Sequence, residues 1–283
     1  MRVFVTGARG QLGTELVGVC RAAADDVVAS EVDITDRDAV HQAICGVQPD
    51  VVVNCAAWTA VDACESDPLR ADLVNGLAVR WIAEACTRVD AHLVHLSTDY
   101  VFDGTLDRPY REDDPPSPLS TYGRSKWRGE REAAMLGTSS TIVRTSWVSG
   151  YHGANMVRTI LDLAARSTSL SFVDDQVGHP TFTADLAPVL RRLAVDRLSG
   201  IVHVTNQGVC SWFEFARAVV ASSGRDPDMV QPIGTRDLVP ARPAPRPANS
   251  VLDNAVLRGA GHALLRHYRE PLDELVAALR TTC

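Results

Sequence analysis

The sequence predicts an α/β fold in which a doubly wound parallel sheet carries a smaller C-terminal lobe, and three observations support this. An apolar strand pattern begins at residue 2 and passes through a glycine-rich turn into an amphipathic helical pattern. Short apolar runs and helical stretches then alternate up to about residue 144, as is typical of a parallel sheet with helices on both faces. After Gly150 this alternation loosens, which indicates a second structural unit.

The first strand, expected at 2–6, ends in the turn Gly7-Ala8-Arg9-Gly10-Gln11-Leu12-Gly13. The Gly-x-x-Gly-x-x-Gly spacing is one residue longer at its first gap than the Rossmann dinucleotide fingerprint. Gly7 permits the tight turn, Gly10 lets the backbone approach a pyrophosphate, and Gly13 lets the following helix lie close to the strand. The start of the chain therefore predicts a Rossmann-like site for a dinucleotide.

The second strand is expected at 27–30, and two acidic residues, Glu31 and Asp33, follow it. A carboxylate at this point accepts hydrogen bonds from the ribose hydroxyls of NADH and repels the additional phosphate of NADPH. Arg9 and Arg37 can offset that repulsion, so the expected cofactor is NADPH or NADH. Asp33 is expected to contact the adenine or its ribose.

The remaining elements follow from the same alternation. Further strands are expected at 51–54, 92–96 and 141–144, and helices at 69–87, 120–135 and 271–280. The proline-rich segments 103–118 and 240–247 are expected to be loops, the first of them ordered or lid-like. We expect residues 1–148 to form an NAD(P)-binding domain. Residues 149–283 are expected to form mainly a substrate-binding lobe, with some segments returning to the sheet.

Three side chains capable of carbonyl chemistry are predicted at the carboxyl edge of the sheet. Lys126 is the only lysine in the chain, and it follows Tyr122 by four residues, which places both on one face of a helix. A compact ammonium can bond ribose hydroxyls and lower the pKa of a nearby phenol, whereas a guanidinium is shaped for carboxylates and phosphates. Thr98 ends its strand and can bond a carbonyl oxygen. Thr98, Tyr122 and Lys126 are therefore the candidate catalytic residues of a short-chain dehydrogenase/reductase.

Composition argues against several other classes. The formal net charge is −7 and the arginines are scattered, so no nucleic-acid or membrane surface is expected. No apolar run reaches the roughly 18 residues of a membrane helix, and no signal peptide fits before the first strand, so we expect a cytoplasmic protein. The 7 cysteines show no zinc spacing, and His92 and His95 belong on opposite faces of a strand, so no metal is expected. A monomer or a homodimer is expected.

The chain as a whole resembles the extended short-chain dehydrogenases and, among them, the dTDP-4-dehydrorhamnose reductase family. The resemblance covers nearly the full length. It is carried by the glycine turn and by the segments Asp33-Ile34-Thr35, 54–65, 97–104, Tyr122-Gly123-Arg124-Ser125-Lys126, 144–148, 175–181 and 246–250. The segments 97–104, 144–148 and 175–181 are much narrower signatures than the glycine turn, which the whole superfamily shares.

The resemblance implies a reaction and a set of contacts. The implied reaction is reduction of the C4 ketone of a dTDP-4-keto-6-deoxysugar by NADPH or NADH. The implied cofactor-binding residues are Gly7, Gly10, Gln11, Leu12, Gly13, Asp33, Ile34, Ala56, Ala57, Thr59, Tyr122 and Lys126. The implied substrate-binding residues are Thr59, Val61, Thr98, Tyr100, Tyr122 and Trp147. Asn75 matches a family asparagine on the helix behind the site.

The chain departs from the family pattern near the sugar. Ser149 stands where an aromatic usually follows Trp-Val, and Met156 stands where Asn-Phe is common. Trp58 fills a position that often holds a smaller residue or a different aromatic one. These departures leave the exact deoxysugar open. Some members bind magnesium between subunits through an acidic residue at the position of Glu15, but a single carboxylate on a helix is more often solvated, so this metal is not expected.

Two alternatives use the same scaffold. A nucleotide-sugar dehydratase or epimerase is disfavoured, because dehydratases carry a Thr-Asp-Glu pattern where this chain has Thr98-Asp99-Tyr100. A non-catalytic NADP-binding regulatory subunit, such as the one that resembles this family in methionine adenosyltransferase, is disfavoured by the retention of Thr98, Tyr122 and Lys126.

Overall fold

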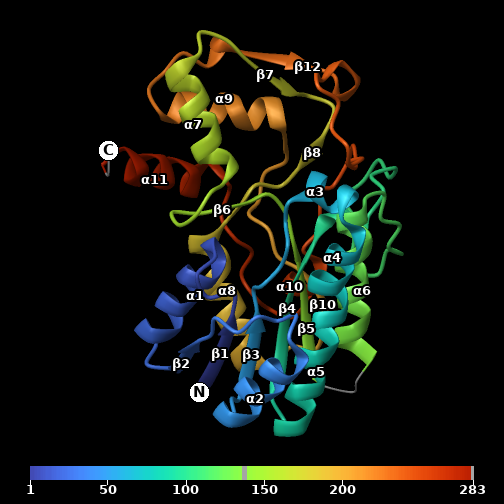
Figure 1. Ribbon diagram of the computed structural model, residues 1–283. Coiled ribbons are helices and arrows are strands. Elements are labelled where there is room, and N and C mark those ends of the chain that lie inside the picture. The colour runs from blue at the N-terminus through green and yellow to red at the C-terminus, as the bar shows by residue number, and fades with distance from the viewer. Residues whose placement is uncertain (136–138, 282–283) are drawn as a thin grey trace.

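The computed structural model describes residues 1–135 and 139–281. At its centre lies a parallel sheet with the strand order β10-β5-β4-β3-β1-β2, shown in Figure 1. These strands are β1 (Arg2–Thr6), β2 (Asp26–Ala29), β3 (Val51–Asn54), β4 (His92–Thr98), β5 (Ser140–Thr145) and β10 (Gly200–His203). The predicted α/β fold and the predicted strands are confirmed to within one or two residues. β10 is the exception, because its short run Gly-Ile-Val-His carries little strand signal of its own.

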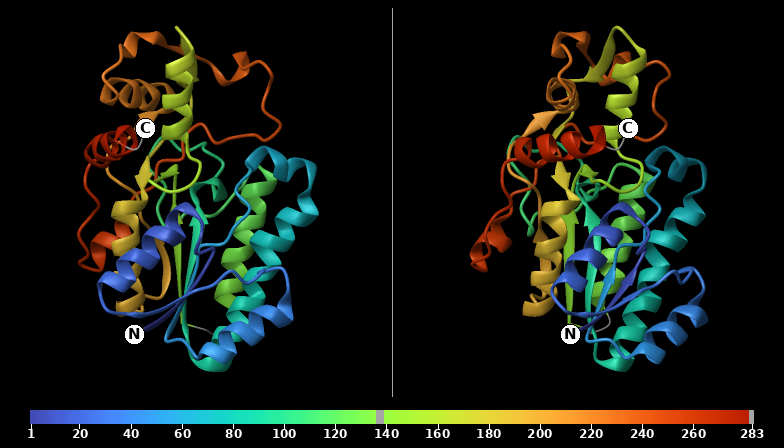
Figure 2. Two further views of the ribbon diagram at one scale, coloured as in Figure 1. Left: turned by 60° about the vertical axis from the view of Figure 1, so that its left-hand side comes forward. Right: turned by 90° about the vertical axis from the view of Figure 1, so that its left-hand side faces the viewer.

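Helices cover both faces of the sheet, and Figure 2 shows the layers. On one face α1 (Gln11–Ala22) packs against α8 (Thr183–Asp196). On the other face lie α2 (Arg37–Val47), α5 (Ala78–Val89) and α6 (Thr121–Met135).

Alternation within the strands supplies both apolar layers. In β1, Val3 and Val5 point into the core beneath α1 and α8, and Phe4 points into the core beneath α2 and α5. In β3, Val51 and Val53 share the first core and Val52 lies in the second. Continuous apolar strands are therefore required, as the sequence shows.

The predicted helix 69–87 is not a single regular helix. It consists of α4 (Pro68–Asp72), the π-helical turn η1 (Leu73–Leu77) and α5. The additional residue in the turn directs Asn75 into the interior, where its side chain accepts from the Trp58 backbone N–H (2.8 Å), donates to the Trp58 carbonyl (3.0 Å) and donates to the Ser125 hydroxyl (3.1 Å). The π-helical turn spans only five residues, which is too short a segment for apolar periodicity to distinguish it from α-helix.

A smaller layer of helices and short strands lies above the carboxyl ends of the strands in Figure 1. Its main elements are α7 (Met156–Arg166), β7 (Leu170–Val173), α9 (Trp212–Ser222), β12 (Val230–Ile233) and α11 (Arg269–Arg280). They share a separate apolar core built around Ile160, Phe215 and Val276. The shorter elements are α3 (Val61–Ser66), η2 (Asp99–Val101), β6 (Val148–Ser149), β8 (Val177–Gly178), β9 (Thr181–Phe182), β11 (Cys210–Ser211), η3 (Pro227–Met229), η4 (Thr235–Asp237) and α10 (Ala255–Gly259).

The segment 103–118 is an ordered loop, as expected from its prolines. Tyr110 fastens it to the C-terminal half: its N–H donates to the Val251 carbonyl (2.8 Å), and its carbonyl accepts from the Asp253 N–H (2.7 Å). The Tyr110 ring stacks on Phe102 with centroids 4.2 Å apart. Of the two forms expected for this segment, the structure shows the ordered one.

A buried ion pair ties α6 to the sheet beneath the predicted site. Arg144 of β5 donates two hydrogen bonds to Glu130, at 2.8 and 2.7 Å, and the Ser97 hydroxyl of β4 donates a third at 2.5 Å. The side chains of Arg144 and Glu130 are 1% and 4% exposed. Charges this deeply buried are tolerated only as a hydrogen-bonded pair.

Replacing Glu130 with alanine is therefore expected to lower the free energy of unfolding by about 3–5 kcal/mol, since Arg144 keeps its charge without a partner. Urea denaturation at pH 7 measures the change. The control is Glu132→Ala on the same helix, which also removes a double hydrogen bond, here from the half-exposed Arg80, together with a longer one of 3.4 Å from the partly exposed Arg128. The control should cost about 1 kcal/mol or less. Equal losses of unfolding free energy in the two variants would contradict the expectation that a buried ion pair is more costly to break than an exposed one.

Candidate active site

The glycine turn brings backbone close to backbone at the top of β1. Gly7 has a φ of +62°, and a Cβ at this position would lie 2.7 Å from the Ala56 nitrogen. A Cβ on Gly13 would overlap the Gly7 carbonyl oxygen, so the first turn of α1 can lie against β1 only with glycine there. Gly10 is the N-cap residue of α1, and no side chain makes a capping hydrogen bond to this helix. The free N–H groups of this helix end can bind an anion.

A pocket of about 370 Å³ opens between this turn and α6. It brings together eight of the predicted cofactor residues, namely Gly10, Gln11, Leu12, Gly13, Ala57, Thr59, Tyr122 and Lys126. Its other lining residues are Cys55, Leu96, Ser97, Thr145, Val148, Gly153 and Ala154. Gln11 Oε1 and Thr145 Oγ1 are buried and have no hydrogen-bond partner among the described residues, so the lining contains polar atoms that a ligand can satisfy.

Four predicted cofactor residues lie outside the lining of this pocket. Gly7 and Ala56 pack against each other behind it, and the Ala56 N–H is held by the Asn54 carboxamide at 3.2 Å. Ile34 is buried in the core beneath α2. Asp33 is exposed and accepts from the N–H (2.9 Å) and hydroxyl (2.7 Å) of Thr35, and these hydrogen bonds lower its pKa.

The end of β2 holds one of the two arginines considered for phosphate. Arg9 of the glycine turn forms an ion pair with Glu31 just after β2, and both side chains are more than half exposed. Arg37 instead pairs with Glu84 of α5 at 3.0 Å. Arg9 is therefore the arginine positioned beside the acidic residues that follow β2.

The side chains of Tyr122 and Lys126 point from α6 toward the end of β4. Lys126 is 2% exposed, and its Nζ donates to the Leu96 carbonyl at 2.5 Å. Burial lowers the pKa of Lys126 to about 8, against the opposing effect of Glu130. Burial raises the pKa of Tyr122 above its ordinary value, and a hydrogen bond with Thr98 offsets part of this rise. The phenol is thus coupled to the hydroxyl predicted to act with it.

The carboxylate of Glu65 fixes the start of α6. It accepts from the Thr121 N–H at 2.7 Å and from the Thr121 hydroxyl at 2.6 Å. A negative charge at a helix N-terminus is favourable, and here it comes from α3 rather than from the local sequence. Because Tyr122 directly follows Thr121, this contact fixes the position of Tyr122 relative to α3 and to the segment that precedes α3.

Thr98 closes β4 and begins η2. Its hydroxyl accepts from the Tyr100 N–H at 3.2 Å and donates to the Asp99 carboxyl at 2.9 Å. The Tyr100 ring meets the Tyr122 ring edge-on, with centroids 5.8 Å apart. Thr98 and Tyr100 at the junction of β4 and η2 therefore form one cluster with Tyr122 of α6.

A second pocket, of about 420 Å³, lies between this cluster and the C-terminal layer. Its lining includes the predicted substrate residues Val61 and Tyr100, and its other members are Met156, Thr159, Leu163, Leu170, Ser171, Phe172, Val173, Gln176, Trp212, Leu238, Arg242 and Arg246.

Trp147 does not line this second pocket. It has a φ of +47° and stacks on Trp212, with centroids 3.7 Å apart and an angle of 12° between the rings. Trp147 therefore contacts Trp212, a residue that lines the second pocket. The expectation that it lies at the sugar receives no support from the lining of either pocket.

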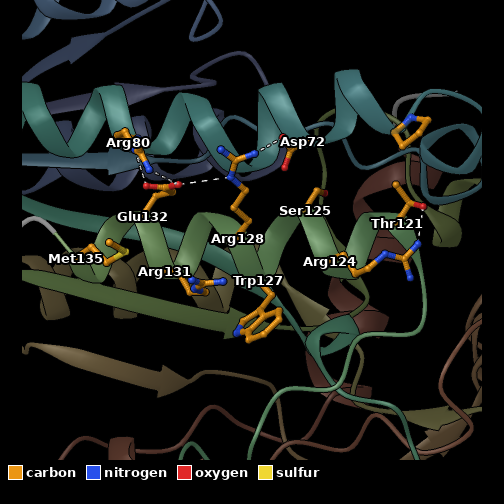
Figure 3. A pocket seen from close by; sticks show the side chains of 11 residues that line it. Asp72, Arg80, Thr121, Arg124, Ser125, Trp127, Arg128, Arg131, Glu132 and Met135 are labelled. Carbon is orange, nitrogen blue, oxygen red and sulfur yellow. Dashed lines mark hydrogen bonds and ion pairs between the residues drawn. The ribbon is translucent and has the colours of Figure 1, made fainter.

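The outer face of α6 is separate from this chemistry. A pocket of about 510 Å³ on that face is lined by residues of α6 and of the neighbouring helices α4 and α5. Figure 3 shows the ion pairs that join these helices, from Arg128 to Asp72 and from Arg80 to Glu132. Tyr122 and Lys126 are not among the residues that line this pocket. The helix thus presents a charged face outward and its two candidate catalytic residues inward.

Sequence reasoning missed several residues of the site. Arg246 donates to both carboxylate oxygens of Asp62, at 3.0 and 2.7 Å, across 184 residues of chain. Arg246 belongs to one of the segments that resemble the family, but the resemblance assigns no role to this residue. Gln176, which belongs to the 175–181 signature, and Arg242 also line the second pocket, and the sequence assigns a role to neither. Asp99 was noted only as part of a motif.

Further observations concern membrane-spanning helices, metal ligands and the cysteines. Among residues 1–135 and 139–281, no helix has the length and apolar character to cross a membrane. The same residues contain no group of three or more side chains suited to a metal ion. His92 and His95 face different partners, Thr141 and Asn54. The cysteines of the described chain carry free thiols.

Comparisons with known proteins cover nearly the whole chain. The family model described as the RmlD substrate binding domain matches residues 1–281. The chain is 45% identical to a dTDP-4-dehydrorhamnose reductase of Streptomyces griseus over 98% of its length and 94% of the relative. It is 42% identical to the spore coat polysaccharide biosynthesis protein SpsK of Bacillus subtilis, over 100% and 99%.

A solved structure agrees with these relatives. The structure of dTDP-4-dehydrorhamnose reductase from Bacillus anthracis in complex with NADP superposes with a TM-score of 0.94 at 36% identity, covering 98% of this chain and 99% of that one. The similarity extends over the sheet and the C-terminal layer alike. It confirms the resemblance inferred from the motifs: the chain belongs to the dTDP-4-dehydrorhamnose reductase family.

Proposed function

We propose that the protein reduces the C4 ketone of a dTDP-4-keto-6-deoxysugar, such as dTDP-4-dehydrorhamnose, with NADPH or NADH. The observation that carries this proposal is that Tyr122 and Lys126 line a pocket headed by a helix N-terminus. Tyr122 contacts Tyr100, which lines the second pocket and is hydrogen-bonded to Thr98. The family relation gives the class of substrate. The reaction belongs to deoxysugar biosynthesis, in the cytoplasm and in a monomer or homodimer.

The first pocket fits a dinucleotide. Gly10, Gln11 and Leu12 would hold the pyrophosphate at the start of α1, and Ala57 and Thr59 would contact the middle of the cofactor. Asp33 and Ile34 would lie at the adenosine, with Gly7, Gly13 and Ala56 shaping the turn. Residues 1–148 would thus bind the cofactor, and residues 149–283 would contribute mainly to the sugar side.

The bound nicotinamide would supply the hydride. Tyr122 would donate its phenolic proton to the C4 oxygen, and Thr98 would steady that oxygen. Lys126 would hold the nicotinamide ribose, and its charge would stabilise the phenolate that remains. Thr59, Val61, Tyr100 and Trp147 are the proposed sugar-side residues, Trp147 acting through Trp212.

The test is an assay of NADPH oxidation with dTDP-4-keto-6-deoxysugars, with and without a 3,5-epimerase, followed by NMR of the product. One NADPH should be consumed for each ketone reduced. An epimerase would convert the substrate without net oxidation of NADPH. A regulatory subunit would bind NADPH, reduce no keto sugar and co-purify with a larger enzyme. Either of these results would overturn the proposal.

The ion pair after β2 gives a prediction for cofactor preference. Glu31→Gln removes a carboxylate that repels the additional phosphate of NADPH and frees Arg9 to contact it. The ratio of the NADH to the NADPH dissociation constant should rise by about 10-fold, as measured by fluorescence titration. Asp26→Asn at the other end of the same strand, where Asp26 pairs with Arg2 at 2.7 Å, should leave the ratio unchanged. An unaltered ratio in Glu31→Gln would place the adenosine elsewhere.

A further inference from the structure

The hydroxyl of Thr98 has more neighbours than it can serve at once. A hydroxyl has one proton to donate and two lone pairs that accept. The Tyr100 N–H occupies one lone pair at 3.2 Å, and the Asp99 carboxyl lies 2.9 Å from the same oxygen. The phenol of Tyr122 is a third neighbour of this hydroxyl. Its hydrogen bond with Thr98 opposes the rise in the Tyr122 pKa that burial causes. One lone pair and one proton must serve Asp99, Tyr122 and any substrate oxygen.

The ionisation state of Asp99 decides how they are shared. An ionised carboxylate can only accept, so it takes the single proton of Thr98. Thr98 then has nothing to donate to a carbonyl oxygen, which is itself only an acceptor. A protonated Asp99 can instead donate to the remaining lone pair of Thr98. The Thr98 proton is then free, and the carbonyl oxygen can receive hydrogen bonds from Thr98 and Tyr122 together.

We propose that Asp99 is a positioning residue that sets the direction of the Thr98 hydrogen bond, so that Thr98 donates to the reacting oxygen only when Asp99 is protonated. The inference rests on the proposed function, because it concerns the carbonyl to be reduced. Asp99 itself touches neither substrate nor cofactor in this account.

The surroundings of Asp99 keep its carboxyl protonated over a wider pH range than an exposed aspartate allows, up to about pH 6. The residue is 2% exposed, and its Oδ2 is buried with no hydrogen-bond partner among the described residues. Burial raises the pKa of the carboxyl to about 6, against the hydrogen bond that Thr98 donates to Oδ1. The ionisable groups that face it are Tyr100 of η2, Tyr122 of α6 and, beyond Tyr100, Arg246 of the segment before α10. Arg246 is already paired with Asp62.

The rate should therefore depend on pH in a defined direction. In the wild-type protein the single-turnover rate of NADPH oxidation should fall by about 10²- to 10³-fold as pH rises through the pKa of Asp99, because one donor to the developing oxyanion is lost. Asp99→Asn has an amide that can donate to Thr98 at every pH. It should keep the low-pH rate and lose this step.

Two further variants separate a positioning role from a structural one. In Thr98→Val the rate should be low at every pH, and adding Asp99→Asn should change it no further. Asp103→Asn is the matched control, since Asp103 lies in the same segment but accepts from Thr105 and Tyr110 away from the site. It should keep the wild-type pH profile. The inference is overturned if Asp99→Asn lowers the rate uniformly with an unchanged profile, or if its effect adds to that of Thr98→Val.

A second measurement does not need turnover. In protein with ¹³C-labelled aspartate, the carboxyl carbon of Asp99 should titrate at a higher pH in Thr98→Val than in the wild type, because the hydrogen bond that favours the ionised form is gone. An unchanged titration overturns the inference even if the enzyme is active. A shifted titration in a protein that reduces no keto sugar would overturn the proposed function and leave the coupling of Asp99 to Thr98 established.

Discussion

Replacing Tyr122 with phenylalanine is expected to lower the rate of ketone reduction by about 10²- to 10⁴-fold, the usual contribution of a positioned general acid. The substitution removes only the hydroxyl. The ring would keep its edge-on contact with Tyr100 at 5.8 Å and its place in the apolar cluster with Cys64 and Ala71. Folding and NADPH binding should therefore change little, and the loss should appear in kcat.

Tyr110→Phe is the matched control, because it also deletes a tyrosine hydroxyl, one that donates to Asp103 at 2.8 Å in the loop 103–118. Its kcat should stay within about 2-fold of the wild type, as a loop hydrogen bond contributes about 1 kcal/mol to stability and nothing to the chemistry. Stopped-flow measurement of NADPH oxidation compares the two variants. A Tyr122→Phe enzyme with near-normal turnover would mean that another group protonates the C4 oxygen.

Lys126→Arg is the second large effect expected. The substitution keeps the positive charge, yet the ammonium is 2% exposed and its Nζ lies 2.5 Å from the Leu96 carbonyl. A wider planar group cannot occupy that position without moving β4 or α6, and it cannot reproduce three tetrahedrally directed donors. We expect kcat to fall by about 10²-fold, the cost of a misplacement of about 1 Å, together with weaker NADPH binding.

The reverse exchange on the same helix provides the comparison. Arg128→Lys alters a partly exposed residue whose ion pairs with Asp72 and Glu132 lie on the outer face of α6. Turnover and NADPH affinity should remain at the wild-type level. Steady-state kinetics and a fluorescence titration of NADPH measure both variants. Unchanged kinetics in Lys126→Arg would show that this position needs only a cation, and the only lysine of the chain would have no special role.

Much of the fold could be predicted from the sequence because its determinants are local. Each strand of the sheet except β10 is a short apolar run, and the glycine spacing after β1 matches a turn that only glycine can adopt. Tyr122 and Lys126 could be paired by helical spacing alone. The contacts that gave rise to errors are not local. The π-helical turn at Asn75 is held by Trp58 and Ser125, which lie 17 and 50 residues away.

The sites on the sugar side were the least predictable. Trp147 is predicted to contact the sugar, and its stacking on Trp212 of α9 is a contact that the sequence does not reveal. Arg246 reaches Asp62 across most of the chain. Arg9 and Arg37 could not be distinguished by sequence, because their choice between Glu31 and Glu84 depends on how β2 and α5 are placed. Side chains of this kind have no periodic signature.

The sequence by itself determined the class of fold, the end of the sheet at which the proposed chemistry would occur and the hydroxyl, phenol and ammonium that are suited to it. Residue type and short-range spacing suffice for these, since they reflect backbone freedom and helical or strand period. Only the tertiary structure decided which polar groups share one proton at Thr98, and which charges are buried as a pair at Glu130 and Arg144. Hydrogen-bond direction and desolvation depend on atoms that the fold brings together from distant parts of the chain.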